Sequence, residues 1–377
     1  MAVRIAALRE EGAHERRTAL TPETAKKLKV LGADLRVQNG TGNAAYFIDS
    51  QYADVDRSDD AAAMLVDADV LLTVQPPSPE RVALLREGAV VIGYLSPHTG
   101  DDRIRALRDR QITAFALELL PRTTRAQAMD VLSSQAGMAG YKAMLIAAQA
   151  SPKFFPMLTT AAGTIRPSKV LVIGAGVAGL QAIATAKRLG GAVEGFDVRP
   201  EVREQIESLG AKFLDLGVSA AGEGGYAREL TAEERAEQQR RLGEHLKGID
   251  VIVSTAAVPG RPAPKIITAA MVDGMKPGAL IVDLAAETGG NCELTRAGET
   301  VVHKGVSIIG PVNLASMGAT HASEMYARNL FNFLSLMIKE GSLSIDWSDE
   351  LIAKSCVTHD GAIKHEPTRA RLEPAAA

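Results

Sequence analysis

The sequence of 377 residues has few cysteines, few aromatic residues and almost no net charge. Cys292 and Cys356 are its only cysteines, which excludes a disulfide framework and a cysteine-based metal cluster and favours a reducing compartment. The 42 basic and 45 acidic side chains give a net charge of −3, which argues against a nucleic-acid-binding protein. No bound nucleic acid and no metal site are therefore predicted.

The sequence also lacks long hydrophobic runs. Charge-free stretches such as residues 305–323 contain Gly, Pro, Asn and Ser, and fall short of the about 20 consecutive apolar residues that span a membrane. Arg9, Glu10 and Glu11 follow the start of the chain too closely for the apolar centre of a signal peptide. A soluble protein of the cytoplasm is therefore expected.

Hydrophobic residues make up 46% of the chain and charged residues 23%, an ordinary globular composition. Short apolar runs alternate with helical patterns, and this rhythm predicts parallel sheets covered by helices on both faces. The expected strands are residues 3–8, 35–37, 69–74, 89–94 and 112–116, followed by 169–173, 192–196, 251–255, 279–283 and 306–309.

Two long helical patterns separate these groups of strands. Residues 126–150 predict a connecting helix, and residues 324–338 carry apolar side chains on one stripe of a second helix. The predicted fold class is α/β, with two Rossmann-like, doubly wound parallel-sheet domains joined by long helices. The expected domains are residues 1–128 completed by the C-terminal tail 322–377, and residues 129–321. A cleft between two lobes is a usual place for a small ligand.

One charged segment and one glycine-rich segment interrupt the second half. Residues 228–247 carry many charges and few large apolar side chains, which is typical of a solvent-exposed helix. Residues 217–225 contain four glycines and no large apolar residue, and we expect a mobile loop there.

The strongest single motif is a dinucleotide-binding fingerprint. A β-branched run at residues 169–173 precedes Gly174, Gly176 and Gly179, and a helical pattern follows them. In such a motif the first glycine allows a tight turn, the second lets a pyrophosphate approach the backbone, and the third allows close helix–strand packing. The start of the following helix then offers unpaired amides to the phosphates.

Asp197 stands at the end of the next predicted strand, 18 residues beyond Gly179. A carboxylate at this place accepts hydrogen bonds from ribose hydroxyls and repels a 2′-phosphate, which favours NAD(H). Arg199 leaves NADP(H) open, because an arginine there can accommodate such a phosphate.

Several segments together resemble the NAD(H)-binding component of proton-translocating nicotinamide nucleotide transhydrogenases. They are residues 17–22, 121–130, 161–167, 169–190, 224–227, 259–264, 283–285, 289–292 and 356–362. The resemblance implies Si/Re-specific hydride transfer between NAD(H) on this chain and NADP(H) on a partner subunit, coupled to proton translocation. It also implies a homodimer, a separate membrane subunit, and a peripheral location on the cytoplasmic face of the inner membrane.

The same resemblance implies roles for individual residues. The implied catalytic residues hold the nicotinamide end, with Gln127 bridging toward the partner's cofactor, Asp130 orienting Arg122, Ser133 bonding the carboxamide and Tyr226 closing over the nucleotide: Arg122, Gln127, Asp130, Ser133 and Tyr226. The implied cofactor contacts are Arg122, Thr123, Thr124, Gln127, Gly174, Gly176, Val177, Gly179, Asp197, Val198, Arg199, Gly225, Thr255, Ala256 and Ala257. Taken alone, Arg122 and Asp130 also fit an ion pair at a helix terminus, and Tyr226 fits an exposed loop side chain.

Alanine dehydrogenases share much of this pattern, and they require a lysine and a histidine for their amino-acid or keto-acid substrate. The matching positions hold Gln75 and Ser96, which serve neither as a cation nor as a proton shuttle near neutral pH. The position of a carboxylate-binding arginine is retained as Arg17, and His98 is a weak substitute for the missing histidine. An alanine dehydrogenase-type enzyme therefore remains the alternative, with a non-catalytic NAD(H) sensor as a further one.

Overall fold

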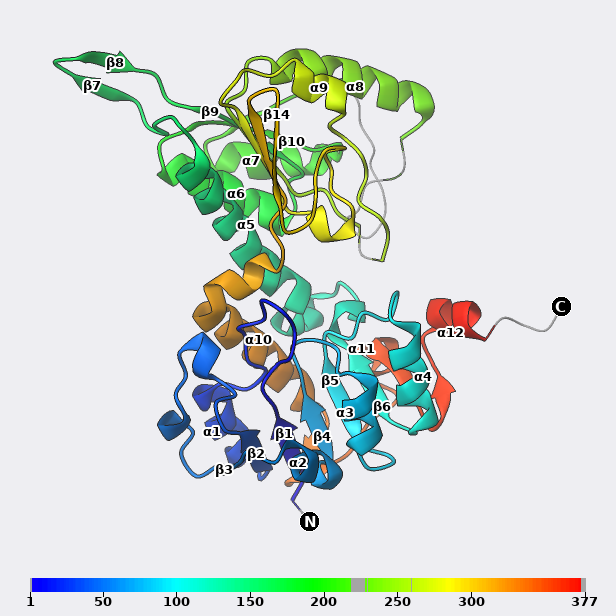
Figure 1. The fold of residues 1–377 in the computed structure, drawn as a ribbon. Helices are drawn as coiled ribbons and strands as arrows, with labels where there is room; N and C mark the ends of the chain where they lie inside the picture. The colour runs from blue at the N-terminus through cyan, green and yellow to red at the C-terminus, as the bar shows by residue number, and fades with distance from the viewer. Residues whose placement is uncertain (1, 218–227, 229, 259, 374–377) are drawn as a thin grey trace. The chain divides into compact units, whose positions relative to one another are not determined.

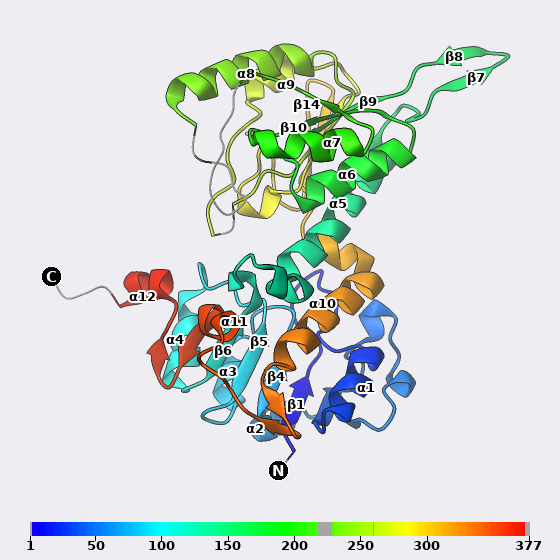
Figure 2. The same ribbon diagram turned by 180° about the vertical axis from the view of Figure 1, so that it is seen from behind.

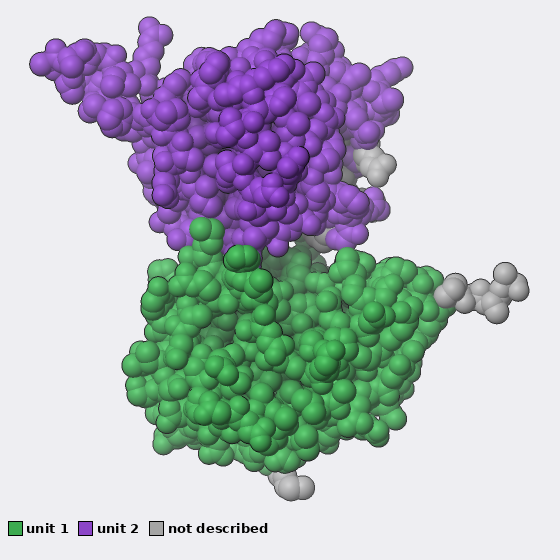
Figure 3. Space-filling view, in the orientation of Figure 1, with its two compact units in different colours: residues 1–135, 316–377 green, residues 136–315 purple. Residues whose placement is uncertain are grey.

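The computed structural model describes residues 2–217, 228, 230–258 and 260–373. The chain divides into two compact units, residues 1–135 with 316–377 and residues 136–315 (Figure 3). Helix α5 (Val131–Ala150) begins in the first unit and continues into the second. Each unit has its own main sheet and its own hydrophobic core.

The first unit is built on an eight-stranded sheet with the order β19-β18-β6-β5-β4-β1-β2-β3. Its strands are β1 (Arg4–Ala7), β2 (Asp34–Gln38), β3 (Asp56–Ser58), β4 (Val70–Leu72), β5 (Val90–Gly93), β6 (Thr113–Ala116), β18 (Cys356–His359) and β19 (Ala362–Ile363). Strands β1 to β6 pair in parallel, whereas β18 pairs antiparallel with both β6 and β19.

Helices cover both faces of this sheet because successive strand residues point to opposite sides. Ile5 and Ala7 of β1 pack in the core with α1, α10 and α11, while Ala6 packs in the core with α2, α3 and α4. Figure 2 shows α1, α10 and α11 on the same face. The helices of this unit are α1 (Pro22–Val30), α2 (Ala61–Asp67), α3 (Pro79–Leu84), α4 (Asp101–Asp109), α10 (Ala319–Leu334), α11 (Glu350–Ser355) and α12 (Glu366–Leu372).

The second unit contains a seven-stranded sheet with the order β11-β10-β9-β12-β13-β15-β14. Its strands are β9 (Lys169–Ile173), β10 (Ala192–Phe196), β11 (Lys212–Phe213), β12 (Val251–Ser254), β13 (Leu280–Asp283), β14 (Thr300–His303) and β15 (Val306–Ile309). All neighbours are parallel except β14 and β15.

Helices again cover both faces of the sheet. One core contains apolar side chains of α5, α6 (Val177–Arg188) and α7 (Arg203–Ser208), and the other contains those of α8 (Ala232–Leu246) and α9 (Ala269–Asp273). The predicted α/β class with two doubly wound sheets is therefore confirmed (Figure 1).

Smaller elements complete the two units. Strands β7 (Leu158–Thr160) and β8 (Gly163–Ile165) form an antiparallel hairpin of exposed residues, and β16 (Ile338–Lys339) pairs with β17 (Ser342–Leu343). The 3-10 turns are η1 (Asn43–Ala45), η2 (Asp49–Gln51), η3 (Leu117–Leu119), η4 (Thr124–Met129), η5 (Pro200–Val202), η6 (Ala286–Thr288) and η7 (Leu314–Gly318).

The helix expected over residues 126–150 begins later than predicted. Turn η4 ends at Met129, and the α-helix starts only at Val131 because Asp130 caps it: Ser133 donates its backbone N–H and its hydroxyl to the Asp130 carboxylate, at 2.9 and 2.5 Å. The charged segment does form an exposed helix, α8. The glycine-rich loop predicted at residues 217–225 lies, apart from Gly217, outside the described residues.

Candidate functional site

The glycine loop of the second unit joins β9 to α6, where the strand order reverses between β9 and β12. Ligands of such sheets bind at the carboxyl ends of the strands beside this reversal. Gly174 has a φ of +90°, and a Cβ on Gly179 would lie 1.8 Å from the carbonyl oxygen of Gly174. The turn and the close helix–strand packing therefore both require glycine.

Gly176 differs from these two glycines because a Cβ built on it meets no atom within 4 Å. It is the N-cap of α6, and no side chain caps this helix end. The space beside Gly176 and the uncapped amides of the first turn fit a pyrophosphate. Val177, the first residue of α6, is 46% exposed at this same helix start.

Asp197 follows β10 and is largely buried beside the glycine loop. Its Oδ2 accepts the backbone N–H of Ala175 at 2.7 Å, and its Oδ1 accepts the backbone N–H of Arg199 at 2.9 Å. Burial raises the pKa of the Asp197 carboxyl, but the hydrogen bonds of Arg199 and Ala175 outweigh it, so the pKa lies below its usual value. An ionised carboxylate beside the glycine loop fits the ribose of a dinucleotide. Val198 is half-buried next to it.

The opposite side of the reversal is formed by Thr255, Ala256 and Ala257, which follow β12. The Thr255 hydroxyl donates to the Gly174 carbonyl at 3.0 Å and so ties the two loops together. Buried Asn291 accepts from the Ala256 N–H at 3.1 Å and donates to the Ala256 carbonyl at 2.7 Å. Sequence reasoning assigned no role to Asn291, although it lies within one of the segments that carried the resemblance.

The candidate nicotinamide-end residues lie in the first unit, within η4 and the residues on either side of it. Arg122 and Gln127 are exposed, and Thr123 caps η4 through a hydrogen bond from the Ala126 N–H at 3.4 Å. Thr124 is exposed as the first residue of η4. The candidate residues Gly225 and Tyr226 lie outside the described part of the chain. The candidates thus form one group in each unit.

The strand order of the first unit reverses between β1 and β4, and a buried polar cluster fills this place. Arg17 forms an ion pair with Glu15, at 2.7 Å between Nη2 and Oε2, and Gln75 donates to the same oxygen at 2.7 Å. Ser96 lies nearby in the loop after β5, where its N–H donates to Glu118 at 2.5 Å. His98, the weak substitute, packs its ring edge-on against His365 with centroids 5.5 Å apart.

Two further buried carboxyls support these loops. Glu10 accepts the N–H groups of Val74 and Gln75 at 2.7 and 3.0 Å, and Glu118 accepts that of Leu95 at 2.9 Å. Burial outweighs these hydrogen bonds and raises the pKa of each carboxyl to about 7. Both side chains hold loop backbone at the carboxyl ends of β4 and β5.

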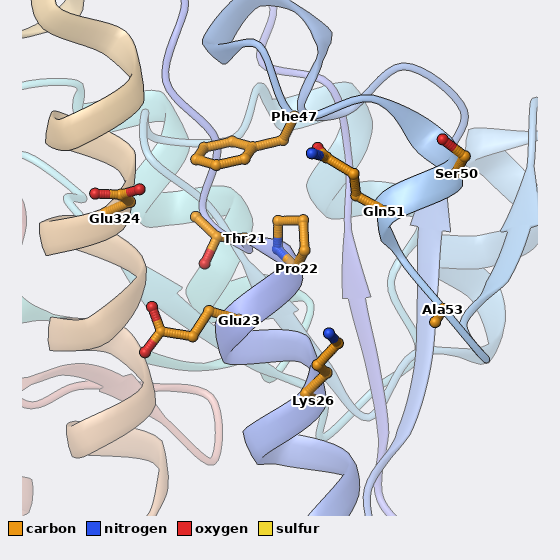
Figure 4. A pocket seen from close by; sticks show the side chains of 9 residues that line it. All are labelled: Thr21, Pro22, Glu23, Lys26, Phe47, Ser50, Gln51, Ala53 and Glu324. Carbon is orange, nitrogen blue, oxygen red and sulfur yellow. The ribbon is translucent and has the colours of Figure 1, made fainter.

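A surface hollow of about 510 Å³ lies elsewhere in the first unit, at the start of α1 (Figure 4). Its lining includes Glu23, Lys26 and Glu324, and none of the candidate residues. Within residues 2–217, 228, 230–258 and 260–373, no cluster of His, Cys, Asp and Glu suits a metal ion. Over the same ranges, every helix is too short or too polar to cross a membrane.

Comparisons with known proteins match nearly the whole chain. The family model "Alanine dehydrogenase/PNT, N-terminal domain" matches residues 6–139, and "Alanine dehydrogenase/PNT, C-terminal domain" matches residues 143–366. The chain is 44% identical over 376 residues to the first of the polypeptides named as NAD(P) transhydrogenase subunit alpha in Rhodospirillum rubrum, covering 96% of this chain and 98% of the relative.

A solved structure, a transhydrogenase from Sinorhizobium meliloti, matches with a TM-score of 0.87 and 43% identity, over 96% of this chain and 99% of that one. Alanine dehydrogenase of Halomonas elongata is 28% identical over 372 residues, covering 96% of this chain and 95% of the relative. The resemblance to the transhydrogenase subunit and the relation to alanine dehydrogenases are thus confirmed.

Proposed function

The chain belongs to the alanine dehydrogenase/PNT family, and we propose that it is the NAD(H)-binding catalytic subunit of a proton-translocating NAD(P) transhydrogenase. Hydride would pass directly, with Si/Re specificity, between NAD(H) on this chain and NADP(H) on a partner subunit, coupled to proton movement across a membrane. The observation that carries the proposal is the open space at Gly176 beside the Asp197 carboxylate, in a chain 44% identical to a transhydrogenase subunit.

The second unit offers a group for each part of NAD(H). The α6 amides and Gly176 would hold the pyrophosphate, Asp197 would accept the ribose hydroxyls, and Val198 and Arg199 would border the adenosine. The loop of Thr255, Ala256 and Ala257 would flank the nicotinamide, which supplies or accepts the hydride when the cofactor is bound. By family resemblance, Gly225 and Tyr226 would close over the nucleotide.

The first unit supports a second nicotinamide as the other reactant. Arg17 is already paired with Glu15, and Gln75 and Ser96 replace the lysine and histidine expected of an amino-acid dehydrogenase. Transfer between two nicotinamide rings needs alignment and exclusion of water, but no general acid or base.

The candidate residues around η4 would then align the rings. Exposed Arg122 would donate to a phosphate or amide oxygen, and exposed Gln127 would bridge toward the partner's cofactor. Asp130 would orient Arg122, and Ser133 would bond the carboxamide. Thr123 and Thr124 would contribute further polar contacts to the cofactor.

We also propose a homodimer that binds a membrane subunit and an NADP(H)-binding subunit on the cytoplasmic face of the inner membrane. The β7–β8 hairpin supports the dimer, because isolated two-stranded hairpins are marginally stable and this one exposes apolar side chains. Met157 is 66% exposed, Leu158 37% and Ile165 44%.

The test is to combine the purified chain with an NADP(H)-binding component from a related transhydrogenase and to follow reduction of acetylpyridine adenine dinucleotide by NADPH. We expect NADH to bind to the chain alone and transfer to require both proteins. Reductive amination of pyruvate with NADH and ammonia by the chain alone would instead establish the alanine dehydrogenase alternative. NADH binding without turnover with either reactant would point to a sensor.

A further inference from the structure

Each unit has one place where its strand order reverses, and the two places are filled differently. In the second unit the reversal between β9 and β12 carries the glycine loop, with open space at Gly176. In the first unit the reversal between β1 and β4 is the equivalent place for a ligand, but it holds the buried side chain of Glu15.

The Glu15 carboxylate is bound as a ligand carboxylate would be. Its Oε1 accepts the N–H groups of Arg16 at 3.1 Å and Arg17 at 2.9 Å, and the Arg17 Nε at 2.8 Å. Its Oε2 accepts the Arg17 Nη2 at 2.7 Å and the Gln75 Nε2 at 2.7 Å. A two-point guanidinium contact supported by an amide and backbone donors is the chemistry that recognises a free carboxylate.

The donors on the other side of this contact are held in place independently of Glu15. Arg17 also donates its Nη1 to the Gln135 Oε1 at 2.9 Å, and Gln135 donates in turn to the Ala322 carbonyl of α10 at 3.2 Å. The guanidinium is only 8% exposed, and the Glu15 side chain is fully buried. Removing the Glu15 carboxylate would therefore leave a shaped, positively charged cavity.

We propose that Glu15 is an internal ligand that fills a site for small monocarboxylates at the strand reversal of the first unit, and thereby excludes small organic acids from it. The atoms of Glu15 beyond Cβ have the size and charge of acetate, which defines the ligand the empty site would take. Because all these residues lie in the first unit, the site does not depend on NAD(H) binding or on the identity of the second reactant.

The test is to titrate Glu15→Ala with sodium acetate and to follow its thermal unfolding midpoint, with sodium chloride at equal ionic strength as the reference. We expect a saturable rise of the midpoint that is specific to acetate, since a ligand that binds only the folded state stabilises it. Wild type and Glu15→Gln, whose side chains keep the site filled, should respond equally to both salts. If Glu15→Ala folds only in acetate, that result also supports the proposal.

Two further variants make the test specific. Glu15→Gly removes one more carbon, so its preference should shift from acetate to propionate. The double variant Glu15→Ala with Arg17→Met should lose the acetate response, because the guanidinium is gone. The proposal is overturned if acetate and chloride act alike on Glu15→Ala, if acetate stabilises all variants equally, or if Glu15→Ala folds in neither salt.

Discussion

The Arg199 guanidinium lies on the Asp197 carboxylate in a two-point contact, with Nε 3.0 Å from Oδ1 and Nη2 2.7 Å from Oδ2. With the Ala175 and Arg199 backbone N–H groups, the carboxylate already accepts four hydrogen bonds. Ribose hydroxyls must compete with the Arg199 side chain for these oxygens. Arg199 is therefore both the counter-ion of Asp197 and the group that a 2′-phosphate would meet.

Replacing Asp197 with Ala should weaken NADH binding and raise the relative affinity for NADPH. Hydrogen bonds to a charged group contribute about 1.5–3 kcal/mol, so we expect a loss of NADH affinity of roughly tenfold to a hundredfold. NADPH should be affected less, because Arg199 is released toward the 2′-phosphate. Calorimetric titration with each nucleotide measures both affinities.

The double variant Asp197→Ala with Arg199→Ala is the control for this prediction. It should lose NADH binding to the same extent and show no relative gain for NADPH. Unchanged NADH affinity in Asp197→Ala would contradict the assigned ribose contact.

Two glycines of one loop should respond differently to alanine. Gly176→Ala places its Cβ in open space, so we expect unchanged stability but roughly tenfold or greater loss of NADH affinity, because the pyrophosphate needs that space. Gly179→Ala places its Cβ 1.8 Å from the Gly174 carbonyl oxygen and should destabilise the fold by about 3 kcal/mol. Thermal unfolding and NADH titration of both variants separate the two effects. Tight NADH binding by Gly176→Ala would place the pyrophosphate elsewhere.

The main sheets could be predicted from the sequence because their strands are buried on both faces and appear as continuous apolar runs. Strands β9, β10 and β15 match the predicted ranges residue for residue. The sequence missed the antiparallel strands β14 and β18 at or near the sheet edges. Strand β14 alternates between exposed and half-buried residues, so its apolar signal is weak.

The glycine loop and Asp197 were identifiable because their chemistry depends on local spacing along the chain. The Glu15–Arg17 pair was not, since its meaning comes from the strand order that brings Gln75 and Gln135 to it. Asn291 was overlooked for the same reason: it acts on Ala256, 35 residues away in the chain. The start of α5 was misplaced because the apolar pattern continues through η4, and only the Asp130 cap marks the boundary.

Gln127→Ala should lower the rate of hydride transfer while leaving NADH binding and stability nearly unchanged. Gln127 is exposed on η4, so its removal costs the fold little, whereas the proposed bridge to the partner's cofactor would be lost. Steady-state transfer with the NADP(H)-binding component and NADH titration of the chain alone measure the two effects. Gln205→Ala, an exposed glutamine on α7, is the matched control and should change neither. Equal losses of binding and rate would contradict the bridging role.

The stability of the fold should fall as pH rises through the range set by Glu10. Burial raises its pKa from 4.5 to about 7, so the folded state holds the proton more tightly than the unfolded state between these values. Stability is therefore greatest below pH 4.5 for this group and declines as pH rises toward 7, by up to about 3 kcal/mol. Glu10→Gln should flatten this part of the profile, as measured by urea unfolding between about pH 5 and pH 8. An equally steep decline in Glu10→Gln would show that Glu10 does not titrate in this range.

Charged substitutions on the β7–β8 hairpin should abolish the proposed homodimer. Leu158 and Ile165 are paired across the hairpin, 37% and 44% exposed, and a two-stranded ribbon has no second layer of its own to cover them. If a second copy covers them, Leu158→Asp with Ile165→Asp buries two unpaired charges at the interface and should yield monomers by light scattering after size exclusion. Val302→Asp, at a valine 68% exposed on β14, is the matched control and should leave the dimer intact. A hairpin variant that remains dimeric would show that other surfaces hold the two copies together.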